Sequence, residues 1–374
     1  MQLPALRWAW VSLCLVLGAG MGSSVYAFPD MIRHGYAACV SCHVSPSGGG
    51  ILTDYGRELS RELLSTWGGE AENKALYGLA ALPEPFKIGG DIRAIQTYRD
   101  TPSVREGKFF LMQADLEGAY VGEKLAVVAS AGWDPGSPDT SSDDAWVSHK
   151  HYVMGQLGYN LSLRAGRFQR NYGLMIPDHS SQIRRGLGFD QGTETYNAEL
   201  NLIEEKFNIS LTAVGGRPDD KSVGSEKGFA ANAVFFFAQS YKVGVSYFLG
   251  KTTADVGREL VGPYWALGLT EKLYWLGEWD LVRIAPVAGG IVEGWVDYNK
   301  LGYELMKGLD VYLVQQAQKS DHTKEKIDTQ SGGLGVQWSP RPHWIFSGQW
   351  QKVSAPARSN TLTDSAYFIF QYYI

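Results

Sequence analysis

The segment LYWLGEWDLVRI, residues 273–284, decides the fold because its side chains alternate with a period of two. One side is apolar and aromatic and carries Leu273, Trp275, Trp279 and Leu281. The other side carries the carboxylates of Glu278 and Asp280. Successive side chains of a β-strand point to opposite faces, so this segment predicts a strand with one apolar and one polar face. A strand of a membrane-spanning barrel needs such a pair of faces, one toward lipid and one toward a polar lumen.

Segments with the same period continue from Phe86 to the end of the chain, separated by turn residues. They predict sixteen strands at residues 86–99, 108–120, 124–133, 147–159, 161–168, 193–203, 206–215, 227–238, 241–250, 259–269, 272–284, 291–304, 308–318, 328–338, 342–353 and 363–374. An even number lets an antiparallel barrel close with both ends of the chain on one side. We therefore expect residues 86–374 to form a 16-stranded antiparallel transmembrane β-barrel.

The connections between these strands alternate in length. Short links fall at residues 122–123, 160, 204–205, 239–240, 270–271, 306–307 and 339–341. Longer polar loops fall between them at residues 134–146, 169–192, 216–226, 319–327 and 354–362. Outer-membrane barrels have short periplasmic turns and long external loops, whereas a soluble β-sandwich does not need this alternation.

Composition agrees with a barrel in lipid. The chain has 44 Gly, 12 Trp and 20 Tyr, and only 20% of its residues are charged. The last strand places Phe368, Phe370, Tyr372 and Ile374 on its outward face. The alternative, a soluble β-rich domain, would leave this aromatic face without a purpose. The net charge of −5, without a long basic run, argues against nucleic acid as a partner.

Residues 1–27 read as a secretory signal peptide. Arg7 precedes an apolar core, and Val25-Tyr26-Ala27 has the form of a cleavage site. Cys14 lies in the apolar core and would be removed with it. Beyond this leader no apolar run approaches 18 residues, so no membrane-spanning helix is expected.

The sequence Cys39-Val40-Ser41-Cys42-His43 follows the leader and has the form of a c-type haem attachment site. Each thiol can add to a vinyl group of the porphyrin, and the adjoining histidine is then held at the iron as an axial ligand. A disulfide or redox pair between the two cysteines is the alternative. It explains neither His43 nor the helix-forming residues before Cys39.

Residues 28–85 are expected to form a small α-helical module that carries this site and the linker to the barrel. Helices are predicted at residues 29–43, after an N-cap at Thr53, and at residues 71–82. Fewer than 60 residues cannot bury a haem well, so the module should borrow a wall from the barrel. Arg57 could pair with a haem propionate or remain a solvated charge. Tyr55 could stack on the haem edge or simply pack.

The sixth ligand of the iron is not assigned by the sequence. Met31 and His34 lie upstream in the same predicted helix as His43 and would not easily reach the opposite haem face. The remaining candidates lie in the barrel or its loops: Met112, His149, His151, Met154, Met175 and His179. An open sixth position is a further alternative.

Two loops carry clustered charge. Residues 169–192 hold Arg170, His179, Arg184 and Arg185, with Arg164 and Arg167 just before them. Such a loop can fold inward and favour anions, or it can be a solvated external loop. A second loop is acidic and could concentrate ferrous iron, through Asp134, Asp139, Asp143 and Asp144.

This organisation resembles the fused monohaem cytochrome c–porins of the outer membrane, the Cyc2-like proteins. The match at residue level lies near the haem motif: Arg33, Cys39, Cys42, His43, and the L-x-x-[FY]-G-R element of Leu52, Tyr55, Gly56 and Arg57. The glycine-rich loop at residues 46–50 departs from the iron-oxidising members and leaves the electron donor open.

The resemblance implies an outer-membrane protein of a Gram-negative bacterium with one covalent haem c. It would move electrons between an extracellular donor or acceptor, with Fe(II) as a candidate, and a periplasmic c-type cytochrome. One alternative is a diffusion porin whose haem domain gates or anchors. Another is a haem enzyme that reacts with peroxide or a gas.

Overall fold

The computed structural model describes residues 30–36, 38–72, 74–79, 82–135, 145–217, 225–357 and 359–374. The predicted leader, residues 1–27, lies outside the described residues, as do Asp139, Asp143 and Asp144 of the acidic loop. Among the described residues no helix has the length and apolar character needed to cross a membrane.

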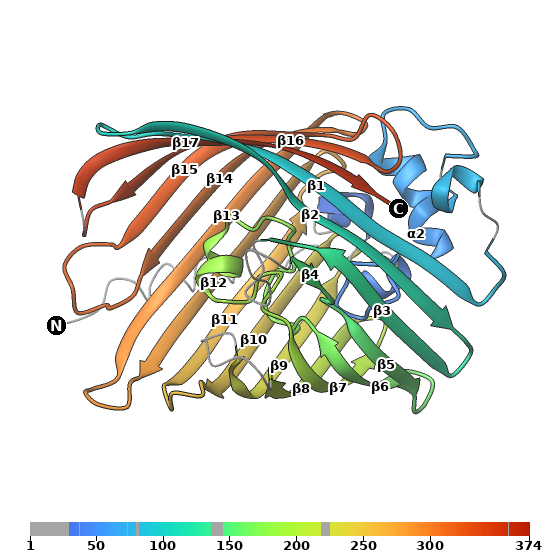
Figure 1. The fold of residues 1–374 in the computed structure, drawn as a ribbon, viewed down its shortest axis with the longest axis horizontal. Helices are drawn as coiled ribbons and strands as arrows, with labels where there is room; N and C mark the ends of the chain where they lie inside the picture. The colour runs from blue at the N-terminus through green and yellow to red at the C-terminus, as the bar shows by residue number, and fades with distance from the viewer. Residues whose placement is uncertain are drawn as a thin grey trace.

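The strands after Phe86 form one closed antiparallel barrel (Figure 1). They are β1 Phe86–Asp100, β2 Arg105–Val121, β3 Leu125–Trp133, β4 Trp146–Val147, β5 His151–Gln156, β6 Leu161–Phe168, β7 Thr195–Ile203, β8 Phe207–Gly216, β9 Lys227–Phe237, β10 Tyr241–Lys251, β11 Gly257–Gly268, β12 Leu273–Ala285, β13 Val292–Met306, β14 Leu309–Lys319, β15 Thr329–Trp338, β16 Trp344–Ala355 and β17 Ser359–Tyr373. The last strand pairs with the first, with Asp91 opposite Tyr373, and this pairing closes the ring. Both β4 and β5 pair with β3 and share one position. The predicted 16-stranded barrel is therefore confirmed.

Two predicted boundaries are wrong. The strand expected at residues 147–159 is interrupted after Val147 and resumes at His151 as β5. There the Ser130 amide donates to the Lys150 carbonyl at 2.7 Å, and the Lys150 amide donates to the Ser130 hydroxyl at 2.9 Å. The neighbouring His149 is buried. The long loop expected at residues 354–362 is instead a narrow hairpin, because β16 continues to Ala355 and β17 begins at Ser359.

The two faces predicted for residues 273–284 are present in β12. Trp275, Trp279 and Leu281 are 37–41% exposed on the outer surface. The alternate residues are almost fully buried inside the barrel and include Tyr274, Leu276, Glu278 and Asp280. The inner face of this wall is therefore not only polar, and its aromatic side chains belong to a packed interior.

Tyrosine rings on the inner side of this wall explain why some of its strand positions are glycine. Tyr274 of β12 pairs with Gly302, and Tyr312 of β14 pairs with Gly335. A Cβ atom built on Gly302 would lie 2.1 Å from the Tyr274 ring, and one on Gly335 would lie 2.3 Å from the Tyr312 ring. Each tyrosine ring thus lies flat against the neighbouring strand, where only glycine leaves room.

The N-terminal module has less helix than predicted. The helix expected at residues 29–43 is replaced by two short 3-10 turns, η1 Asp30–His34 and η2 Cys39–Ser41. Gly35 lies between them at φ +82°, a left-handed conformation that ends the first turn. The predicted cap is present: Thr53 accepts a hydrogen bond from the Gly56 amide at the start of α2, Asp54–Leu59. A π-helical turn, η3 Ser60–Leu64, continues it. Among the described residues of the third predicted helix, a 3-10 turn forms, η4 Ala75–Gly78.

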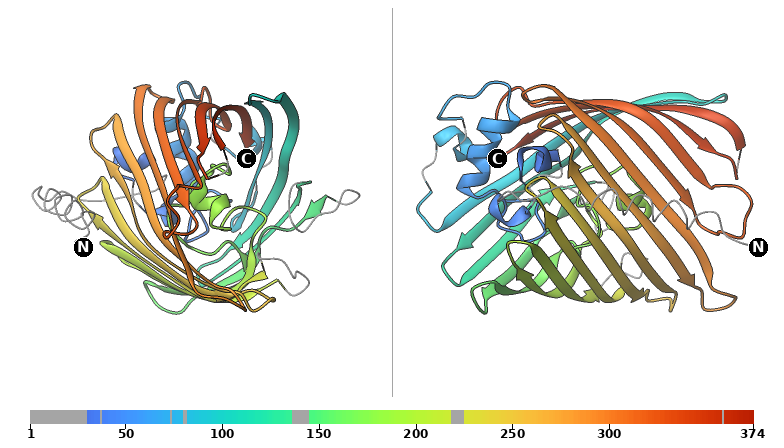
Figure 2. Two further views of the ribbon diagram at one scale, coloured as in Figure 1. Left: turned by 90° about the vertical axis from the view of Figure 1, so that its left-hand side faces the viewer. Right: turned by 180° about the vertical axis from the view of Figure 1, so that it is seen from behind.

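The module enters the barrel at the end that carries the short turns (Figures 1 and 2). Buried Arg33 pairs with Glu304 at 3.4 Å and Asp310 at 3.3 Å, beside the turn between β13 and β14. Ile51 packs against Ala119, Val128 and other inner side chains of β2, β3 and β5. The expectation that this small module borrows a wall from the barrel is confirmed.

The segment after η3 lies along the barrel rim. The Thr66 amide donates to the Ser339 carbonyl and the Trp67 amide to the Pro340 carbonyl, in the turn between β15 and β16. Tyr77 accepts a hydrogen bond from the Trp344 indole at 2.8 Å. The C-terminal residue lies at the same end, because the Ile374 amide donates to the Gly90 carbonyl.

The connection between β6 and β7 folds into the barrel, and we call residues 169–192 the lumen loop (Figure 1). It contains a π-helical turn, η5 Gln182–Gly186. On one side Tyr172 donates to Asp280 of β12 at 2.7 Å. On the other, His179 contacts Arg93 of β1 at 2.7 Å. The loop therefore crosses the lumen between opposite walls, and the solvated external alternative is wrong.

Candidate functional site

The sequence motif forms one tight turn at the lumen end of the module. The amides of Cys42 and His43 both donate to the Cys39 carbonyl, at 3.2 and 3.1 Å. Cys39 and Cys42 pack in one small cluster with Leu59. Cys39 and Cys42 are free thiols in this arrangement.

The environment of Cys42 disfavours a redox role for the pair. Burial against Leu59 and the neighbouring module side chains raises the pKa of the Cys42 thiol to about 11, and Cys39 adds to the shift. Reactive thiols in redox pairs have lowered pKa values, because the thiolate is the nucleophile.

His43 is held in the form that binds a metal. Burial lowers the pKa of its imidazole to about 4, so the ring is neutral at physiological pH. The Nδ1 atom is buried and makes no well-formed hydrogen bond among the described residues. A short β-bridge between His43 and Leu52 fixes the backbone on either side of the loop at residues 44–51.

A glycine loop covers the thiol of Cys39. Gly48, Gly49 and Gly50 all have positive φ angles, between +68° and +83°. A Cβ atom on Gly48 would lie 3.2 Å from the Cys39 Sγ and 3.8 Å from the His43 ring. Gly48 therefore allows the loop backbone to lie directly against Cys39 and His43.

A cavity joins this turn to the lumen loop and the inner barrel wall. From the module it is lined by Ala38, Cys39, Pro46 and Ser47, and from the lumen loop by Asn171, Gly173 and Met175. The volume open to the centres of water molecules is about 40 Å³, which holds a few waters. A porphyrin bonded to Cys39 therefore requires the glycine loop or the lumen loop to move aside.

Arg57 is buried, so the solvated alternative is wrong. One guanidinium nitrogen donates to the backbone carbonyl of Ile88 in β1. The other, Nη1, is buried without a hydrogen-bond partner among the described residues, and burial lowers the pKa of the group. This unsatisfied donor suits a carboxylate, so the propionate pairing stays a prediction. Tyr55 is 46% exposed, and its hydroxyl lies 3.5 Å from that of Tyr36.

Gly56 explains why the element around Arg57 requires a glycine. A Cβ atom at this position would lie 2.4 Å from the Cys42 carbonyl oxygen. The start of α2 therefore rests directly on the backbone of the cysteine turn. The Thr53 amide donates to the same Cys42 carbonyl at 2.8 Å, which ties the helix cap to the turn.

We expect Gly56→Ala to separate α2 from the cysteine turn, because the methyl group cannot be placed without moving backbone. Overpacking of this kind costs about 1–3 kcal/mol. Limited proteolysis of the purified protein should then cut within residues 44–64, while the barrel keeps its shifted mobility in unheated gels. Gly69→Ala is the matched control, since its Cβ would meet nothing within 4 Å. Equal protease resistance of the two variants would contradict this account.

A buried ion pair holds the glycine loop to the barrel. Arg164 of β6 pairs with Glu199 of β7 at 2.6 Å and donates to Ser45 at 3.0 Å and Ser47 at 3.4 Å. Arg164 is 1% exposed and Glu199 is fully buried. On the other side of the loop, Lys150 pairs with Glu117, close to Gly50. Sequence reasoning considered Arg164 only as a source of positive charge and missed its partner in β7.

We expect Arg164→Leu to destabilise the protein by about 3–5 kcal/mol, because it leaves Glu199 buried without its cation. The midpoint of urea unfolding in detergent measures this loss. Arg283→Leu removes a comparable but half-exposed arginine that contacts Glu259 and Glu293, so its effect should stay under about 1 kcal/mol. A shift of the same size in both variants would argue against a buried clamp.

The candidate sixth ligands occupy different environments. His149 contacts Asp134 at 3.4 Å and Glu194 at 3.3 Å, His151 contacts Ser148 and Tyr196, and His179 contacts Arg93 and Asp190. Met154 packs against the cluster around Ile51, and Met31 is buried in η1. Met112 lies at a bulge between β1 and β2. Met175 borders the same cavity as Cys39.

The arginines near the lumen loop are largely neutralised. Arg170 and Arg258 both pair with buried Glu226, at 3.2 and 2.6 Å. Arg184 is buried and donates to backbone carbonyls of the loop itself. Arg185 is exposed. The predicted concentration of positive charge is therefore mostly matched by lumen carboxylates, which were not foreseen from the sequence.

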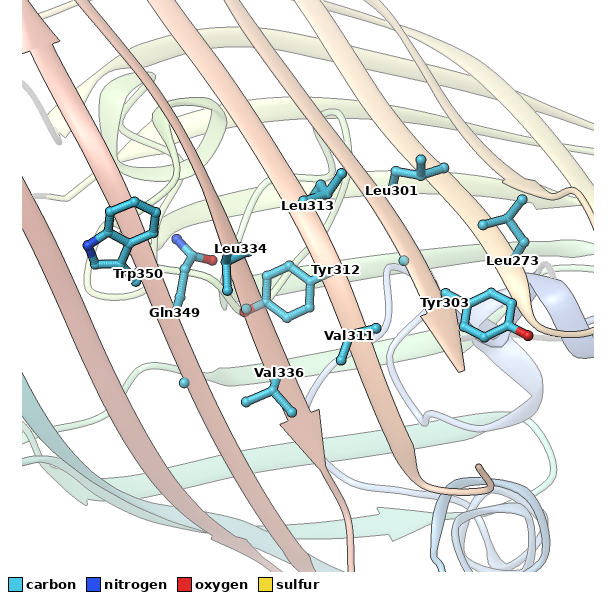
Figure 3. Close-up of a pocket in the computed structure, with 13 residues that line it drawn as sticks. Leu273, Leu301, Tyr303, Val311, Tyr312, Leu313, Leu334, Val336, Gln349 and Trp350 are labelled. Atoms are coloured by element: carbon cyan, nitrogen blue, oxygen red, sulfur yellow. The ribbon is translucent and has the colours of Figure 1, made fainter. Parts of the chain in front are cut away.

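Another hollow lies on the outer surface, away from the cysteine turn. Figure 3 shows it over β13 to β16, lined by Leu301, Leu313, Leu334, Val336 and Trp350. These side chains belong to the outward, apolar face of the barrel and are 39–59% exposed. The hollow is part of the surface expected to face lipid.

Comparison with known proteins places the barrel but not the module. No protein-family model and no curated protein sequence matches the chain. Among solved structures, it is similar to OmpT of Vibrio cholerae, with a TM-score of 0.60, 9% identity and coverage of 79% of this chain and 99% of the other. It is also similar to the outer membrane channel DcaP of Acinetobacter baumannii, with a TM-score of 0.55, 14% identity and coverage of 79% and 100%. It is also similar to an anion-selective porin from Comamonas acidovorans, with a TM-score of 0.58, 11% identity and coverage of 77% of this chain and 99% of the other.

These similarities show a fold of the outer-membrane porin type. The matched share of the chain is about that of residues 86–374, the barrel alone. The identities are too low to carry more than the fold, and the cysteine turn, the module and any bound group remain predictions.

Proposed function

We propose that this chain is an electron-transfer protein of the Gram-negative outer membrane that carries one covalent haem c inside a porin-type barrel. Electrons would pass between an extracellular donor or acceptor, with Fe(II) as a candidate, and a c-type cytochrome in the periplasm. The observation that carries the proposal is the turn of Cys39, Cys42 and His43, which the module holds at the short-turn end of the lumen.

The residues present suit this cofactor chemically. Two free thiols stand at the required spacing, beside a buried, neutral imidazole. Arg57 offers a buried, unpaired guanidinium nitrogen for a propionate. When bound, the haem would supply a centre for transfer of one electron, with its potential set by axial ligation, hydrogen bonding and burial.

The remainder of the chain would insulate and orient this centre. Ile32 of the module and six aromatic or aliphatic residues of the lumen loop join one apolar core with the inner barrel wall. The loop residues are Tyr172, Leu174, Ile183, Leu187 and Phe189, with Ile176 packed against them. A polar, water-filled lumen is usual in porins, whereas this apolar core would exclude water beside Ile32 of the module.

Optical spectroscopy of whole cells and of purified protein tests the proposal. Purified mature protein should carry one pigment per chain that acid–acetone extraction does not remove. Fe(II) added outside intact cells should reduce that pigment, and a soluble periplasmic cytochrome should reoxidise it in membranes. Protein without bound pigment would refute the haem, and pigment that no external reagent reduces would refute the route.

A second function is a diffusion porin in which the module serves as a gate or anchor. The comparisons bear on it more directly than on electron transfer, since the matched structures include an outer membrane channel and an anion-selective porin. Planar-bilayer recordings separate the two functions. Ion conductance that is unchanged in a His43→Ala variant would favour the porin. A peroxide- or gas-reactive haem enzyme would instead require an open sixth position with measurable turnover.

A further inference from the structure

The part of the lumen loop nearest the cysteine turn is fixed in place by the barrel. The Tyr172 hydroxyl donates to Asp280 at 2.7 Å, the Gly173 amide donates to Ser246 at 2.8 Å, and the Leu174 amide donates to Glu278. Tyr172 and Leu174 are no more than 1% exposed. Three consecutive residues are thus anchored to β10 and β12, so the position of the following residue is set by the barrel wall.

Gly173 makes this anchoring possible. It has φ +60°, and a Cβ atom there would lie 2.0 Å from a carboxylate oxygen of Glu278. Only glycine lets the loop backbone approach the carboxylate this closely. The close approach leaves Tyr172 and Leu174 directed into the core.

The alternate residues of the same segment line the cavity beside the cysteine turn. Asn171, Gly173 and Met175 border it from the lumen loop, and Ala38 and Cys39 border it from the module. Met175 and Cys39 therefore border the same cavity from opposite segments. The histidine candidates described above already contact carboxylates, hydroxyls or Arg93.

We propose that Met175 would supply the second protein ligand of the haem iron, in addition to His43. This inference rests on the proposed function, because it requires a haem bonded to Cys39 and Cys42. Thioether sulfur is an established ligand in c-type cytochromes and raises the reduction potential relative to ligation by two imidazoles. The ligand comes from a loop that begins and ends on the side of the barrel opposite the module, so the lumen loop and the module would meet at the iron.

Met175→Ala and Met175→His test the assignment in the full-length protein, with Met154→Ala as the matched control. Met154 packs against the module near Val44 and Ile51 but does not border the cavity. The parent and the control should show a low-spin six-coordinate spectrum. Met175→Ala should become high-spin and bind carbon monoxide when reduced. Met175→His should return to low spin with a lower midpoint potential.

The outcomes separate this inference from the proposed function. Pigment that is covalently bound and stays low-spin in Met175→Ala would overturn the ligand assignment and leave the haem in place. A parent protein that is already high-spin would also overturn it. A parent without covalent pigment would refute the proposed function first. If Met175→Ala does not assemble, the potential of Met175→His decides, because an unchanged potential means that residue 175 is not a ligand.

Discussion

Replacing both cysteines of the turn, Cys39→Ala with Cys42→Ala, should abolish covalent pigment while the barrel still assembles. Each sulfur supplies one thioether bond, so the double variant has no means of attachment. The amount of pigment that stays with the protein on denaturing gels and after acid–acetone extraction should fall from one per chain to none. Pairing of β1 with β17 closes the barrel without using either cysteine, so mobility shifts on heating should persist.

Ser41→Ala is the control for this experiment. Ser41 lies between the two cysteines. Its backbone carbonyl, not its side chain, accepts the hydrogen bond from the Thr53 hydroxyl at 2.7 Å. The substitution therefore keeps the turn and should keep the pigment. If the double cysteine variant retained pigment after acid–acetone extraction, the haem would be attached elsewhere and the site would be misassigned.

Opening the lumen should have the second large effect. The Arg170 side chain contacts the Gly188 carbonyl and the Phe189 ring, so residues 170 and 188 lie near each other. A short glycine linker between them can therefore replace residues 171–187. We expect the parent to conduct ions only weakly, because the lumen loop and the module fill the passage from opposite sides. Conductance in planar bilayers should rise in this deletion and rise further when residues 30–85 are also removed, to stable steps of the size that porins show.

A deletion in an external loop provides the comparison. Residues 322–326 lie in the connection between β14 and β15 and are exposed. Removing them should leave conductance at the level of the parent. A parent that already conducts strongly, with no change on deletion of the lumen loop, would show that ions pass elsewhere and would favour the diffusion porin.

The barrel was predictable because its signal is local. Lipid on one face imposes alternation on every strand, as in β12, and a residue reveals its face through its immediate neighbours. Predictions failed where the determinant is not periodic. Gly35 interrupts the helix expected across residues 29–43, and the hairpin of β16 and β17 extends through residues that look like a polar loop.

The candidate site was predictable only in its covalent part. The spacing of Cys39, Cys42 and His43 is a motif within five residues, so the sequence alone reveals it. The role of Arg164 could not be read in this way, because its partner Glu199 is separated from it by 35 positions. Nothing near Met175 distinguishes it in the sequence from Met154. Met175 differs from Met154 only in the folded protein, where Gly173 of the lumen loop lies against the carboxylate of Glu278 in β12.

The sequence by itself thus determined the antiparallel strands, their order and the spacing of the two thiols and the imidazole, since these depend on near neighbours along the chain. Only the tertiary structure decided that the module enters the short-turn end, that the lumen loop folds inward, and that Met175 borders the same cavity as Cys39. These depend on burial of apolar and paired charged groups between segments more than 100 residues apart. Such long-range packing leaves no periodic trace in the chain, because many different inner side chains can fill the same lumen.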